Sequence, residues 1–130
     1  MDRYLLITGR VLLALYFLLP GIMKFTAWDG HLALMEKHGM IMIPFLLALA
    51  AICQITSSLM IIANRYVAIA AIILAVLVLI INVNLHDFWN FTGTDAGHEK
   101  QNFIKNIAIF AGLLILSGLT WKDTFTKTKI

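Results

Sequence analysis

The chain has 130 residues, of which 61% are hydrophobic and only 13% are charged. Soluble domains carry about 25% charged residues, and a domain of this length cannot hide so much apolar surface from water. This composition excludes a water-soluble globular protein. The net charge of +3 is not concentrated in a basic groove with interleaved aromatic residues, so we also predict no nucleic-acid partner.

Four apolar runs follow one another along the chain, over about 4–26, 40–63, 66–85 and 103–121. Each run has the length that a helix needs to cross about 30 Å of hydrocarbon. Apolar residues surround every face at the centre of each run, which excludes amphipathic surface helices. The sequence therefore predicts an all-α protein, an antiparallel four-helix transmembrane bundle that forms one membrane domain over residues 1–130.

Lysine and arginine predict the orientation of this bundle. After four crossings both termini lie on the same side of the membrane. That side carries Arg3, Arg10, Arg65, Lys122, Lys127 and Lys129. The opposite side carries Lys24, Lys37, Lys100 and Lys105. Because an excess of these residues marks the cytoplasmic side, we predict that both termini are cytoplasmic and that the opposite end of the bundle, called the outer end below, faces away from the cytoplasm.

A polar contact is predicted near the cytoplasmic end of the first two runs. With a rise of about 1.5 Å per residue, Arg10 and Gln54 reach a similar depth from opposite directions. An unpaired arginine at this depth is costly, and the side-chain carbonyl of Gln54 can accept its hydrogen bond. We therefore predict a direct or water-bridged hydrogen bond between them; the alternative is that Arg10 reaches the lipid head groups.

Polar residues also gather near the outer end. All four histidines (His31, His38, His86 and His98) fall on this side, together with Trp28 and Trp89. Because polar groups are expensive in lipid, those at hydrocarbon depth should point inward together. We predict a ligand-binding set whose polar atoms converge on one cavity beside the two tryptophans: Lys24, Asn82, His86, Asn102, Asn106 and Trp89. The alternatives are a polar clasp that only fixes helix packing, and anchoring at the membrane interface.

The residues present argue against several kinds of chemistry. Cys53 is the single cysteine, so thiol–disulfide exchange lacks a second thiol. Only one histidine, His86, is close to the hydrocarbon, whereas a membrane haem usually needs two facing ligands. The spacing of His86, Asp87 and His98 or Glu99 matches no zinc rule, so we predict no metal. No self-contained catalytic constellation is present, and we assign no catalytic residue.

Three stretches together resemble the DoxX family of small four-helix membrane proteins. They are "GRVLLALYFLLPGIMKF" in the first run, "NLHDFWN" after the third, and "HEKQNFIKNIAIFAGLLIL" at the start of the fourth. The resemblance implies a four-helix bundle in the bacterial inner membrane and an association with quinol oxidation and redox homeostasis. Family members often carry a glutamate where this chain has Gln54, which makes a proton-handling role at this position doubtful.

The expected function combines the outer polar set with this resemblance. We expect a multi-pass inner-membrane protein that is an accessory subunit of a redox or quinone-linked assembly, at most a quinol-oxidase-related subunit. It would bind a quinone-like or lipid-like molecule near its outer face, where lysine, histidine and asparagine can donate to quinone carbonyls. Its partners would be membrane lipid and either a redox protein or a second copy of the chain. The alternatives are a non-enzymatic binding or transport module for a small hydrophobic solute, and a structural partner of a larger membrane complex.

Overall fold

The structure of the chain, a computed structural model, describes residues 1–126. Within these residues the elements are α1 (Asp2–Thr26), α2 (Trp28–Lys37), α3 (Ile43–Ile62), α4 (Val67–Leu85), the short 3-10 helix η1 (Phe88–Asn90) and α5 (Gly93–Thr124). Four helical segments are long and apolar enough to cross a membrane: Asp2–Thr26, Ile43–Ile62, Val67–Asn90 and Gly93–Thr124. The predicted all-α bundle with four membrane helices is therefore confirmed.

Two features of the fold differ from the prediction. A further helix, α2, connects α1 to α3, and its 10 residues are too few to cross a bilayer. The last helix begins at Gly93 rather than at 103. Hydropathy could not mark this extension, because residues 93–102 are mostly polar, although glutamate, lysine and glutamine favour helix.

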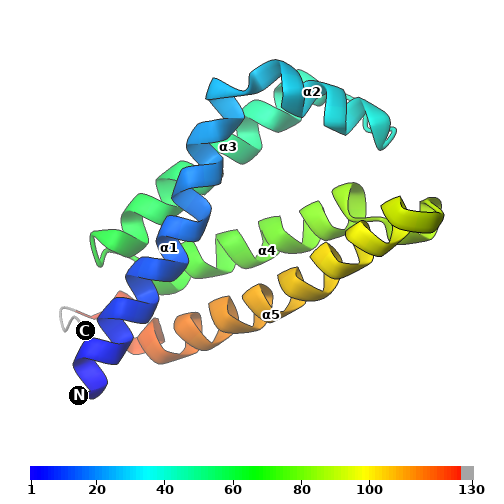
Figure 1. Cartoon of the computed structure of the whole chain (residues 1–130). Coiled ribbons are helices and arrows are strands. Elements are labelled where there is room, and N and C mark those ends of the chain that lie inside the picture. The colour runs from blue at the N-terminus through cyan, green and yellow to red at the C-terminus, as the bar shows by residue number, and fades with distance from the viewer. Residues whose placement is uncertain (127–130) are drawn as a thin grey trace.

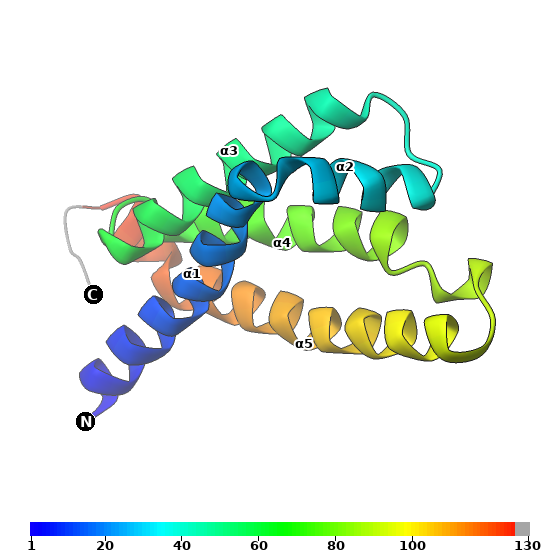
Figure 2. The same ribbon diagram turned by 45° about the horizontal axis from the view of Figure 1, so that its top comes forward.

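The helices pack as two pairs, α1 with α3 and α4 with α5, and the pairs meet through α3 and α4. Figures 1 and 2 show that the pairs lie close together near the α3–α4 turn and diverge toward the other end, where α2 lies. α4 is the central helix, because it packs against both α3 and α5 and has eight buried residues against four in α1. Its buried face includes Ala68, Ala71 and Ala75, and such small residues let helix backbones approach closely.

Both ends of the described chain lie at the same end of the bundle, and apolar side chains cover its outside. The start of α1 and the end of α5 lie at the same end, as an even number of crossings requires (Figure 1). Large apolar side chains such as Leu12, Leu19 and Ile115 are exposed around the outside, where lipid would surround them. Lys127 and Lys129, on which the orientation prediction partly depends, lie outside the described residues.

The cytoplasmic location of both termini stays a prediction that cysteine labelling can test. In a Cys53→Ser background, we expect a membrane-impermeant maleimide to label Thr94→Cys in intact cells. Thr126→Cys should react only after the inner membrane is permeabilised, because it lies at the opposite end of α5. Labelling of Thr126→Cys, but not of Thr94→Cys, from outside intact cells would show that the orientation is opposite to the predicted one.

Candidate functional site

The inner polar contact differs from its prediction. Arg10 is 8% exposed and donates through Nη1 to the side-chain oxygen of Asn64, in the turn between α3 and α4. Gln54 is also buried and donates from Nε2 to the backbone carbonyl of Phe17, at 2.7 Å. The predicted direct bond between Arg10 and Gln54 is therefore wrong.

The physical reason is the length of the arginine side chain, which extends toward the inner end of the bundle and reaches the turn. The water-bridged form stays a prediction, because Gln54 Oε1 and Arg10 Nε are both buried without a hydrogen-bond partner among residues 1–126. Each side chain still joins α1 to the α3 segment. The general role predicted for the pair, a polar contact between these helices, is therefore retained with different partners.

The predicted outer set divides into two groups. Asn82 is 1% exposed, accepts a hydrogen bond from Asn106 at 3.0 Å and donates to the backbone carbonyl of Phe103 at 3.1 Å. These bonds join α4 to α5, which is the polar clasp that was considered as an alternative. Asn102 is half-buried one turn from Asn106, and Trp89 is 54% exposed with its ring packed edge-on against Phe103.

A cavity of about 550 Å³ lies between α2, α3 and α4 toward the outer end, and Lys24 and His86 both line it. Its walls are apolar side chains of α3 and α4, among them Leu46, Ile73 and Val76. A cavity does lie between the spans, but it brings together only two of the six residues of the predicted set. The other four are absent from its described lining, and so is Trp28.

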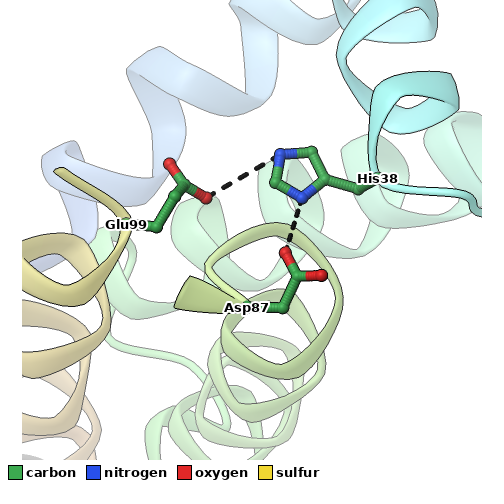
Figure 3. A group of neighbouring side chains, drawn as sticks. All are labelled: His38, Asp87 and Glu99. Atoms are coloured by element: carbon green, nitrogen blue, oxygen red, sulfur yellow. Dashed lines mark hydrogen bonds and ion pairs between the residues drawn. The ribbon is translucent and has the colours of Figure 1, made fainter. Parts of the chain in front are cut away.

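A second polar group joins three segments (Figure 3). It lies next to this cavity, because His86 belongs to both. His38 follows α2, Asp87 follows α4, and Glu99 belongs to the first part of α5. His38 Nδ1 is 2.6 Å from Asp87 Oδ1, and His38 Nε2 is 3.8 Å from Glu99 Oε2. His86 adds its Nδ1 at 3.4 Å from the same Glu99 oxygen. We call these four residues the His/acid cluster.

The local chain geometry explains how the His/acid cluster forms. α2 ends before His38, and Gly39 then adopts a φ of 72°, a left-handed conformation that glycine accepts without strain. Asn90 fixes the position of Asp87, because its side-chain amide donates a hydrogen bond to the second carboxylate oxygen, Oδ2, at 2.7 Å. The cluster is largely shielded from solvent, with side-chain exposures of 2% for His38, 7% for Asp87 and 19% for Glu99.

The position of the His/acid cluster in the fold is also informative. His38 comes from the half of the molecule that contains α1 and α3, whereas Asp87 and Glu99 belong to the half that contains α4 and α5. The cluster therefore bridges the two helix pairs at the end of the bundle where they diverge. Sequence reasoning missed His38, because it lies in a polar loop far along the chain from its partners and only the gathering of histidines on one side indicated it.

Comparison with known proteins agrees with the fold. A family model described as DoxX matches residues 5–87, which run from α1 to the turn after α4. The Inner membrane protein YphA of Escherichia coli (strain K12) is 26% identical to this chain over 113 residues, which cover 87% of this chain and 81% of that protein. No solved structure matches the chain. Glu99 lies beyond the part that the family model matches.

Proposed function

The chain belongs to the DoxX family and is a multi-pass inner-membrane protein, and from this premise we propose that it binds a quinone-like or lipid-like molecule in the cavity between α2, α3 and α4. In this proposal it serves as an accessory subunit of a redox or quinone-linked membrane assembly. The role is one of binding and presenting a membrane-dissolved molecule, and no residue is assigned a catalytic step.

The observation that carries the proposal is the cavity itself. Its volume of about 550 Å³ is in the range of about 300–1,000 Å³ that ligand pockets occupy. The walls along α3 and α4 are apolar apart from Asn84, whereas Lys24, His31 and His86 are the histidine and lysine side chains that line the cavity. An elongated molecule with an apolar tail and one polar head group matches this distribution of side chains.

The chemistry of these polar residues favours a head group that accepts hydrogen bonds. The ammonium group of Lys24 has three donors, and a neutral imidazole such as that of His86 has one. Quinone carbonyls are acceptors without a donor of their own, so they complement this lining. A phospholipid phosphate could also pair with Lys24, and the experiment below separates the two ligands.

Cys53 provides a direct reporter, because it lines the cavity and is the single cysteine of the chain. We expect a short-chain ubiquinone analogue to slow alkylation of Cys53 by N-ethylmaleimide in purified protein. Lys24→Met and His86→Leu should each raise the concentration needed for protection by about 5–10-fold, since one hydrogen bond contributes about 1 kcal/mol. Lys105→Met is the matched control, because exposed Lys105 on α5 is absent from the described lining.

Thermal stability should be measured on the same variants. If Lys24→Met and His86→Leu lower stability but leave protection per folded molecule unchanged, the cavity residues serve packing only and the proposal is rejected. Protection by phosphatidylglycerol vesicles but not by the quinone analogue would assign the cavity to a lipid. Mass spectrometry of molecules that co-purify in mild detergent provides an independent test of occupancy.

Two other functions predict different results. A binding or transport module for a small hydrophobic solute would accumulate that solute in vesicles, and its cavity would show no preference for a carbonyl head group. A purely structural subunit would show no protection of Cys53 by either ligand, and its deletion would prevent assembly of a partner complex. The apolar lining supports a bound molecule over an empty structural role.

A further inference from the structure

The His/acid cluster contains buried polar atoms that no protein group satisfies. Glu99 Oε2 and His86 Nδ1 are both buried without a hydrogen-bond partner among residues 1–126, although they lie 3.4 Å apart. His38 Nε2 approaches the same Glu99 oxygen at 3.8 Å, too far for a hydrogen bond. A buried carboxylate oxygen without a partner is costly, so its position between two imidazole nitrogens requires an explanation.

Against the prediction from sequence spacing that no metal binds, we propose that His38, His86 and Glu99 bind a divalent transition-metal ion at the outer end of the bundle, with Asp87 as the residue that orients His38. A cation bound to Glu99 Oε2 would satisfy that buried oxygen, and His86 Nδ1 and His38 Nε2 are the nitrogens that approach the same oxygen and could complete its ligands. The inference does not depend on quinone binding in the neighbouring cavity. It adds a site with a different chemistry that joins different elements of the fold.

The hydrogen bond of His38 supports a role as a metal ligand. A carboxylate can only accept, so His38 Nδ1–H donates to Asp87 Oδ1 across 2.6 Å. This bond selects the tautomer in which Nε2 carries a lone pair, and Nε2 is the nitrogen that faces Glu99. Histidine ligands of metals usually have such a carboxylate behind the second nitrogen, which fixes the ring and raises its basicity.

The two distances from Glu99 Oε2 and the donor types agree with a metal of the zinc class. In a tetrahedral zinc site with bonds of about 2.1 Å, neighbouring ligand atoms lie about 3.4 Å apart. The observed separations of 3.4 Å and 3.8 Å from Glu99 Oε2 are close to that value. The residues whose ligand atoms all lie within 4.8 Å of one another are His38, Asp87 and Glu99, and His86 joins this group through its approach to Glu99 Oε2. Two imidazoles and one carboxylate favour zinc, iron or cobalt over magnesium and calcium.

A bound ion would also hold the two helix pairs together at the outer end of the bundle. His38 follows α2, His86 follows α4 and Glu99 belongs to α5, so one ion would join the two helix pairs where they diverge. Three protein ligands leave a fourth position open for water or another molecule. His86 also lines the cavity, which places the ion next to the proposed ligand.

Zinc titration of the purified protein tests this inference. The protein should carry a purification tag without histidines and be stripped with a chelator before calorimetry with Zn²⁺. We expect one ion per chain, with affinity lowered roughly 100-fold or more in His38→Ala and Glu99→Gln. Asp87→Asn should lower the zinc affinity about 10–100-fold, as is typical when the residue that hydrogen-bonds to a metal ligand is replaced. His31→Ala and His98→Ala are the histidine controls and should bind as the original protein does.

Two outcomes would overturn the proposal. The first is unchanged zinc binding in both His38→Ala and Glu99→Gln, and the second is an equal loss in His98→Ala. Thermal denaturation without zinc shows whether each variant is folded. With Zn²⁺ added, the Tm of the original protein should rise and that of Glu99→Gln should not. The quinone protection assay separates the two sites, because Glu99 is absent from the described lining of the cavity and Glu99→Gln should keep protection of Cys53.

Discussion

Replacing Asn64 with alanine should lower the free energy of unfolding of the bundle by about 2–3 kcal/mol. Asn64 supplies the side-chain oxygen that accepts a hydrogen bond from Arg10, a buried charged residue of α1. Its loss leaves a buried guanidinium with one partner fewer, and hydrogen bonds to charged groups contribute more than neutral ones. Arg10 Nε already lacks a hydrogen-bond partner among the described residues, so no other bond of that atom can compensate for the one lost from Nη1.

The backbone of Asn64 adds a second contribution that a glycine variant separates. Asn64 has a φ of 58°, in the left-handed region that asparagine and glycine tolerate better than alanine. Asn64→Gly keeps this conformation accessible and removes only the side-chain contacts. We therefore expect Asn64→Gly to be less destabilising than Asn64→Ala by about 1 kcal/mol.

A double-mutant cycle tests whether Arg10 is the origin of the effect. Arg10→Leu removes the charge, so adding Asn64→Gly to Arg10→Leu should destabilise far less than Asn64→Gly does alone. Unfolding by dodecyl sulfate in mixed micelles, followed by circular dichroism, gives the free energies. If the effects of the two substitutions are simply additive, Arg10 and Asn64 do not depend on each other and this account is wrong.

Hydropathy predicted the membrane helices well because the bilayer imposes a length and a composition on each of them. It could not predict α2, since ten residues of mixed polarity satisfy no such constraint. The start of α5 was missed for the same reason, because Gly93 to Asn102 extends beyond the apolar run. Tertiary packing, rather than composition, decides the structure of these segments.

The site was predicted less completely than the fold. Depth along a helix placed Lys24 and His86 near one level, and they do share a cavity. Depth does not specify which way a side chain points, so Asn82 and Asn106 were assigned to the cavity although they bond to each other between α4 and α5. The contact of His38 with Asp87 depends on how two loops meet, and a single sequence carries no periodic signal for that.

Gly21 marks a close approach of α1 to α3, and we expect Gly21→Val to be a strongly disruptive substitution on this face. A Cβ atom at Gly21 would lie 3.0 Å from Ile55 Cγ1 and 3.4 Å from Gln54 Cγ. The first distance is tighter than ordinary van der Waals contact, and valine adds two methyl groups to that Cβ. Overpacking of this kind costs about 1–3 kcal/mol when the neighbours must shift.

The same substitution should also break a polar contact, which raises its expected effect above overpacking alone. Gln54 reaches the carbonyl of Phe17, one helical turn before Gly21, at 2.7 Å, and this distance requires the two helices to stay close. Pushing α3 away leaves the buried amide of Gln54 without its acceptor, which adds about 1–3 kcal/mol. Gly9→Val is the matched control on α1, because a Cβ there meets nothing within 4 Å. Unfolding in mixed micelles should therefore show a loss of about 2–6 kcal/mol for Gly21→Val and little change for Gly9→Val. Equal effects of the two would mean that α1 does not depend on this close approach.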